Sequence, residues 1–148
     1  MLKEWTLNYL KNRDIVLRRI STIEQKNGYF IVKNKDESHI AIVVKEKIED
    51  FGILLKKIKD LEEEHKADKV TLVIYNSKEN FSHLLKNWKK LILIEKMTII
   101  FVNTECNEKW SIVPYIHNRI ADPESLETGL KSLFESVPIY SDSASSGL

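Results

Sequence analysis

The residues able to do chemistry are few in this chain, and their spacing excludes the commonest catalytic and cofactor-binding motifs. Glycine occurs only at positions 28, 52, 129 and 147. A phosphate-binding P-loop and a dinucleotide fingerprint both need several glycines close together, so neither is present. No G-x-S-x-G nucleophile motif occurs either. The histidines are far apart, with no pair at i, i+4, so we expect each to be structural rather than a zinc ligand: His39, His65, His83 and His117.

The single cysteine, Cys106, has no partner for an intrachain disulfide. This favours a reducing, intracellular setting, and we interpret the thiol as inert. The longest apolar runs, such as residues 40–44, fall well short of the roughly 18 residues that a membrane span requires. The first residues also lack the apolar stretch of a signal peptide. We therefore expect a cytoplasmic protein that has no membrane partner.

The charges of the chain nearly cancel, with 23 Lys and Arg against 22 Asp and Glu. A net charge of +1 disfavours a protein that is held to phosphate by bulk attraction. Basic residues are nevertheless gathered around a predicted hairpin and the strand that follows it. They predict a local basic ridge that binds nucleic acid, made of Arg18, Arg19, Lys33, Lys35, Lys45 and Lys47.

The elements that must position these residues begin with an amphipathic helix over residues 2–13. Residues 15–23 are rich in β-branched side chains, and Asn27-Gly28 is a strong turn signal before the apolar residues 29–32. Together they predict a hairpin. The continuous apolar run of residues 40–44 is typical of a strand that is covered on both faces, so we place it at the centre of a sheet.

The second half of the chain alternates helices with strands. Apolar residues at helical spacing predict a helix over residues 48–66, and a strand–helix–strand segment of this kind is expected to form a right-handed parallel crossover. The three tryptophans are assigned to the core. The remaining expected elements are a strand at 70–75, a helix capped by Asn76, strands at 97–102 and 110–113, and a last helix that begins at Asp122 with Pro123 in its first turn.

These elements predict the α/β class: a mixed β-sheet flanked by helices on both faces, in the order α-β-β-β-α-β-α-β-β-α. We expect residues 1–140 to form one domain. Residues 141–148 contain four serines and no apolar stripe, which predicts a disordered tail.

The order of helix, three antiparallel strands, crossover helix and strand, with a third strand that reads Ile40-Ala41-Ile42-Val43-Val44-Lys45, resembles the restriction-endonuclease-like, or PD-(D/E)xK, superfamily. In particular it resembles the branch of archaeal Holliday-junction resolvases. The resemblance covers residues 2–75, about half of the chain. It implies a restriction-endonuclease-like core in which Lys45 matches the family lysine that stabilises charge at the attacked phosphate.

The chain departs from the family pattern at the acidic positions. Val43 stands where the family has an acid, and the preceding strand, residues 29–32, contains no carboxylate. Glu4 stands where some relatives place an additional metal-binding glutamate, and Asp36 or Glu46 could act as a displaced ligand for Mg²⁺. A conventional two-carboxylate metal site is not expected, so the resemblance implies a non-catalytic relative without a cofactor.

Three hypotheses follow. The first is a non-catalytic protein of nuclease-like fold that binds nucleic acid or serves as a subunit of a nucleic-acid-processing complex. The second is an active Mg²⁺-dependent nuclease that uses Lys45 with displaced carboxylates, Glu4 and Asp36 first among them. The third is a homodimeric or adaptor protein without a nucleic-acid role, whose interface is residues 110–115 and the last helix.

Overall fold

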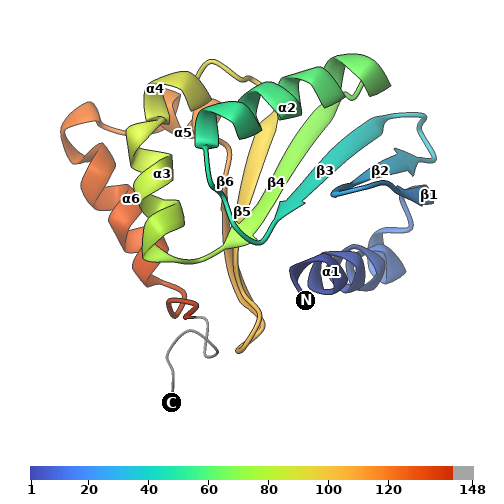
Figure 1. Ribbon diagram of the computed structural model, residues 1–148, viewed down its shortest axis with the longest axis horizontal. Helices are drawn as coiled ribbons and strands as arrows, with labels where there is room; N and C mark the ends of the chain where they lie inside the picture. The colour runs from blue at the N-terminus through green and yellow to red at the C-terminus, as the bar shows by residue number, and fades with distance from the viewer. Residues whose placement is uncertain (142–148) are drawn as a thin grey trace.

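The computed structural model describes residues 1–141 and contains one six-stranded mixed sheet with helices on both faces (Figure 1). The strands lie in the sheet in the same order as in the sequence, from β1 to β6. The elements are α1 (Leu2–Leu17), β1 (Ile20–Gln25), β2 (Tyr29–Asn34), β3 (His39–Lys45), α2 (Phe51–His65), β4 (Lys69–Tyr75), α3 (Lys78–Lys86), α4 (Trp88–Leu91), β5 (Met97–Asn103), β6 (Glu108–Ile112), α5 (Pro114–Ile120), the 3₁₀ turn η1 (Pro123–Ser125) and α6 (Leu126–Glu135).

The strand directions follow from the connections. Short turns join β1, β2 and β3, and these strands are antiparallel. Helical crossovers join β3 to β4 and β4 to β5, and these three central strands are parallel. A final hairpin adds β6 antiparallel to β5. The predicted α/β class, the order of the main elements and the mixed sheet are therefore confirmed, with α4, α5 and η1 as additional short elements.

The two faces of the sheet are covered unequally. One face packs against α2, α3, α4 and α6 around a core that includes Leu72, Ile99 and Phe101. Within residues 1–141, α1 is the one helix on the other face, over a smaller core that includes Leu2, Leu10 and Val73 and against which Tyr140 also packs (Figure 1). A helix of 16 residues is about 24 Å long, so α1 leaves part of this face without a helical cover.

The end of α1 differs from the sequence prediction. Residues 15–17 are helical, and β1 begins only at Ile20, although these β-branched residues favoured a strand. The Asp14 carboxylate explains the difference, because its Oδ1 accepts hydrogen bonds from the backbone amides of Arg19 (2.7 Å) and Ile20 (2.9 Å). Arg18 takes a left-handed conformation (φ 50°) and ends the helix by donating its amide to the Asp14 carbonyl.

The helix after β4 also begins differently. Ser77, and not Asn76, is the N-cap of α3, and its Oγ accepts from the amide of Asn80 at 3.1 Å. The last helical segment begins as predicted, because the Asp122 carboxylate accepts from the amide of Glu124 and Pro123 opens the first turn.

No helix within residues 1–141 is long and apolar enough to cross a membrane. Of the predicted tail, 141–148, all but the first residue lies outside the described residues.

Candidate functional site

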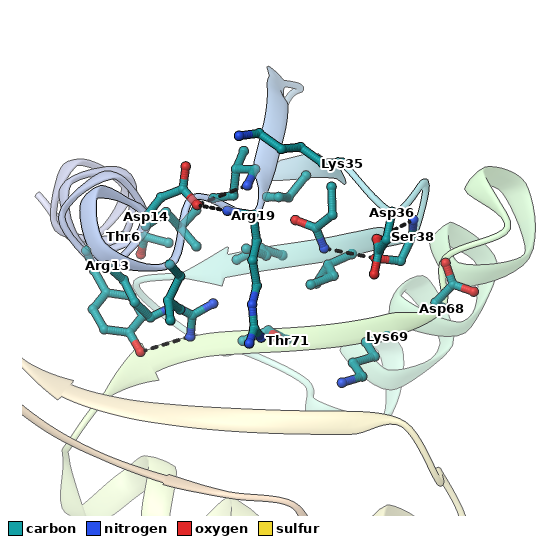
Figure 2. Close-up of a pocket in the computed structure, with 18 of the residues that line it drawn as sticks. Thr6, Arg13, Asp14, Arg19, Lys35, Asp36, Ser38, Asp68, Lys69 and Thr71 are labelled. Carbon is teal, nitrogen blue, oxygen red and sulfur yellow. Dashed lines mark hydrogen bonds between the residues drawn. The ribbon is translucent and has the colours of Figure 1, made fainter.

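A cleft opens between α1 and the uncovered part of the sheet, and it collects several of the basic residues that the sequence singled out (Figure 2). Arg18 and Arg19 connect α1 to β1, and Lys35 lies in the turn between β2 and β3. The amide of Lys35 donates to the carbonyl of Arg19 at 2.8 Å, which holds these two segments together at the rim. The cavity has a volume of about 590 Å³.

The floor of the cleft is the apolar face of the sheet. Strand alternation places Ile40 and Ile42 of β3, and Thr71 and Val73 of β4, on the face that carries α1. Ile100 of β5 completes this floor. Helix α1 contacts β3 and β4 but leaves the first residues of β4 accessible: Lys69 is exposed and Thr71 is half-buried.

The cleft contains two cations that the sequence analysis did not select, Arg13 and Lys69. Figure 2 shows the side chains of Arg13 and Arg19 reaching toward β4, and Lys69 extends from the first residue of β4. Arg13 is held by the hydroxyl of Tyr9, to which its Nη1 donates at 3.3 Å. Among the described residues, none of these three cations has a carboxylate within ion-pair distance.

Three carboxylates also line the cleft, but each accepts hydrogen bonds from the chain around it. Asp14 caps the end of α1, and Asp68 Oδ2 accepts from the amide of His39 at 2.8 Å. Asp36 Oδ1 accepts from the hydroxyl (2.6 Å) and the amide (2.9 Å) of Ser38. These bonds hold the pKa of the Asp36 carboxyl below its usual value. The lining therefore has five Lys and Arg residues against three carboxylates, an excess of two positive charges.

Aromatic side chains continue the cleft along α1. Tyr9, which lines the cleft, stacks on Trp5 with ring centroids 5.2 Å apart and an interplanar angle of 7°. The Arg13 guanidinium lies 5.4 Å from the centroid of the Tyr9 ring, and the ammonium of Lys109 lies 5.1 Å from it. Trp5, Tyr9 and Arg13 thus form a column at i, i+4 and i+8 on one side of the helix.

The structure does not bring the other predicted basic residues to this cleft. Lys33 forms an ion pair with Glu24 of β1 at 3.0 Å. Lys45 ends β3, and Lys47 follows it, whereas the cleft is at the first residues of that strand. The predicted ridge of six basic residues is thus divided, and only Arg18, Arg19 and Lys35 share one site.

The residues proposed for metal-dependent cleavage also lie apart. Asp36 precedes β3 and Lys45 ends it, so about 20 Å of extended strand separates them. Val43 is 1% exposed and packs on the face of α2. Alternation places Lys45 on the same face as Val43, while exposed Glu4 is on α1 at the opposite face.

Glu46 has a structural partner. Its Oε1 accepts from the backbone amide of Leu2 at 3.1 Å and from the terminal amine at 3.2 Å. These hydrogen bonds lower the pKa of the Glu46 carboxyl and fix the first turn of α1 against the end of β3. Within residues 1–141, no group of three or more His, Cys, Asp and Glu side chains is placed to hold a metal ion.

A buried polar cluster lies at the opposite end of the parallel strands. Asn76 is fully buried, and its Nδ2 donates to the carbonyls of Phe134, Val137 and Pro138 at 3.1–3.3 Å. Its Oδ1 accepts from Nε1 of Trp110 at 2.8 Å. Both N–H donors of this amide and one of the two lone pairs of its oxygen are engaged by the chain, so the cluster joins α6 and β6 to the sheet.

The segment considered as a dimer interface is largely internal. Trp110 and Ile112 are 6% and 5% exposed, and Pro114 is buried. The buried residues of α6, Leu130 and Phe134, pack into the main core of the same chain. These side chains are occupied within the chain.

The fold and the cleft define a mixed α/β protein with a cleft on the α1 face of its sheet, whose lining within residues 1–141 has five Lys and Arg residues and three carboxylates. Comparisons with protein-family models, with curated proteins and with solved structures found no match for this chain.

Proposed function

We propose that the protein binds nucleic acid through the cleft between α1 and the sheet, as a non-catalytic protein. The observation that carries this proposal is that Arg13, Arg19 and Lys69 line one cleft without a carboxylate within ion-pair distance among residues 1–141. Like charges held together repel one another, and an anionic ligand removes this cost. Guanidinium groups form paired hydrogen bonds with phosphate oxygens, and an ammonium adds a point charge.

The near-neutral composition is compatible with this function because the field of a cleft depends on local charge. The carboxylates of the cleft accept hydrogen bonds from amides or a hydroxyl of the chain, while Arg13, Arg19 and Lys69 form no ion pair within residues 1–141. Arg18 and Lys35 at the rim extend the positive surface beyond the three central cations.

The arrangement of the strands supports a nuclease-like scaffold that binds and does not cleave. The antiparallel β1–β3 unit, the crossover α2 and parallel β4 occur in the order that the resemblance implies. Val43 occupies the acid position and is buried in the core. Lys45 is remote from Asp36 and faces away from α1, so the side chains that a metal-dependent nuclease needs are not collected at one place.

The charge reversal Arg19→Glu tests the proposal. Lys59→Glu is the matched control, because Lys59 is exposed on α2, at the opposite face of the sheet. Binding is measured by fluorescence anisotropy with labelled single-stranded, duplex and branched DNA at 50 mM salt. We expect Arg19→Glu to weaken binding roughly 10- to 100-fold, the value of one or two hydrogen bonds to a charged group, and Lys59→Glu to change it less than about twofold.

Equal weakening by both variants, or no binding to any of the DNA forms at 50 mM salt, would overturn the proposal. The same samples are incubated with Mg²⁺ and with Mn²⁺ and analysed for cleavage. Cleavage that disappears in Lys45→Ala would establish the active-nuclease hypothesis in place of a non-catalytic one.

A further inference from the structure

The cleft combines an apolar floor with cationic walls, and these two surfaces match different parts of a nucleotide. Ile42, Val73 and Ile100 are 4%, 1% and 8% exposed and are packed within the chain, so the accessible apolar surface of the cleft comes from half-buried Ile20 and Ile40 and from Leu17, which is 42% exposed. A duplex presents phosphates, sugars and base edges, so it leaves such a floor uncovered. An unpaired base exposes its flat apolar faces and can cover it.

The volume of the cleft also favours an unpaired nucleotide over a duplex. The cavity, at about 590 Å³, is within the range of about 300–1,000 Å³ that is typical of pockets for one small organic molecule. A site of this size admits a nucleotide that has left its stack, whereas a duplex is a wide rod that contacts only the rim.

The column on α1 supplies a second platform beside the cleft. The Tyr9 ring contacts both Trp5 and the Arg13 guanidinium, and Tyr9 and Arg13 are the two members of the column that line the cleft. Nucleic-acid bases stack on guanidinium planes as well as on aromatic rings, and aromatic neighbours hold a guanidinium in one orientation. Arg13 is thus placed to contact a base on one side while its donors face a phosphate.

We infer that the ligand of the cleft is single-stranded nucleic acid, with one unpaired base on the floor beside Thr71, a neighbouring base against Arg13, and the intervening phosphates at Arg19 and Lys69. This inference rests on the proposed function, and it adds the form of nucleic acid and the part of the ligand that each surface recognises.

Strands with and without bases test it directly. Anisotropy is measured with labelled dT20, with rU20, with an abasic strand of the same length and charge, and with a 20-base-pair duplex, all at 100 mM salt. We expect dT20 or rU20 to bind at least about fivefold more tightly than both the abasic strand and the duplex, which is the lower end of what stacking one base contributes.

A variant of the floor locates the base. Thr71→Met extends a longer side chain into the cavity without changing its charge, and Thr71→Val, which has the same shape as threonine, is the control. We expect Thr71→Met to reduce the ratio of dT20 to abasic affinity to about one, while Thr71→Val leaves it unchanged. Circular dichroism and the melting temperature confirm that both variants are folded.

The single-strand inference and the proposed function are overturned by different results. Equal affinity for dT20, the abasic strand and the duplex, with continued sensitivity to Arg19→Glu, would leave nucleic-acid binding in place and overturn the single-strand inference. An unchanged base preference in Thr71→Met would overturn the placement of the base on the floor. No binding to any of the four probes would overturn the proposed function itself.

Discussion

The salt dependence of binding is a quantitative consequence of the cleft. Each phosphate that a cation neutralises on a single strand releases counterions, and the slope of log K against log salt changes by about −0.7 per contact. The three cations over β4 give a slope of about −2, and all five Lys and Arg residues of the lining give about −3.5. Between 50 and 200 mM salt, these slopes correspond to losses of affinity of about 20-fold and about 130-fold.

The measured slope for dT20 is therefore expected between −2 and −3.5, and Arg19→Ala is expected to reduce its magnitude by about 0.7. Lys59→Ala, on the opposite face, is the control that must keep the wild-type slope. Anisotropy titrations at five KCl concentrations provide these numbers, because the slope does not depend on the absolute affinity. A slope near zero would refute phosphate binding at the cleft. An equal change in the two variants would show that overall charge, and not this site, determines the binding.

Two further predictions concern the framework that holds the cleft. Asn76→Ala leaves the indole N–H of buried Trp110 and at least one carbonyl of the α6 segment without a partner, so urea denaturation is expected to show a loss of about 2–4 kcal/mol in the free energy of unfolding. The control is Asn118→Ala, which removes the acceptor of the Trp88 indole N–H at an exposed position where water can replace it. This change is expected to lower the free energy of unfolding by less than about 0.5 kcal/mol. Equal losses in Asn76→Ala and Asn118→Ala would contradict the role of burial. The second prediction is a pH dependence at Glu46, whose folded-state pKa is lowered chiefly by the amide of Leu2. Because the folded-state pKa of Glu46 is lowered, its contacts stabilise the folded protein at pH values above 4.5, the usual pKa of this carboxyl. This stabilisation is lost as the pH falls through the folded-state pKa. Glu46→Gln is thus expected to be less stable than wild type at pH 7 and to approach it in acid, and parallel stability curves from pH 7 to pH 3 would argue against the Glu46–Leu2 contact.

Much of the sheet was predictable from local patterns. Residues 40–44 and 70–75 are uninterrupted apolar runs, and both became central parallel strands that are covered on two faces. The end of α1 was not predictable from the same rule. The β-branched residues Ile15 and Val16 are exposed helical residues, 71% and 83%, because a single carboxylate at Asp14 ends the helix later than their propensity suggests.

The candidate site was predictable only in part, for a geometric reason. Arg18, Arg19 and Lys35 are close in the sequence to one turn of the hairpin, so their proximity could be inferred from local structure. Arg13 and Lys69 meet them only because α1 crosses the sheet above β4, which is a long-range arrangement. The position of Arg13, four residues after Tyr9 and eight after Trp5 in a helix, is the signal that could have selected it.

Strand alternation explains why Lys33 did not join the site, while Lys45 and Lys47 lie at the far end of β3. The face of a strand residue changes with every step, so Lys33 lies on the α2 face while its neighbours Val32 and Asn34 line the cleft. Alternation also places Lys45 and Glu46 on opposite faces of the sheet. Glu46 faces α1 and binds its first turn. Of the six basic residues of the predicted ridge, Arg18, Arg19 and Lys35 line the cleft, and the other three do not.

The positive character of the cleft depends more on how the acids are used than on how many there are. Asp14 accepts from the amides that follow α1, Asp36 forms the turn before β3, and Asp68 links the starts of β3 and β4. Each of these carboxylates accepts hydrogen bonds from the chain, and within residues 1–141 none lies within ion-pair distance of Arg13, Arg19 or Lys69. A chain with nearly equal numbers of acids and bases can thereby have a locally positive cleft, because the carboxylates of its lining stabilise turns and a helix end.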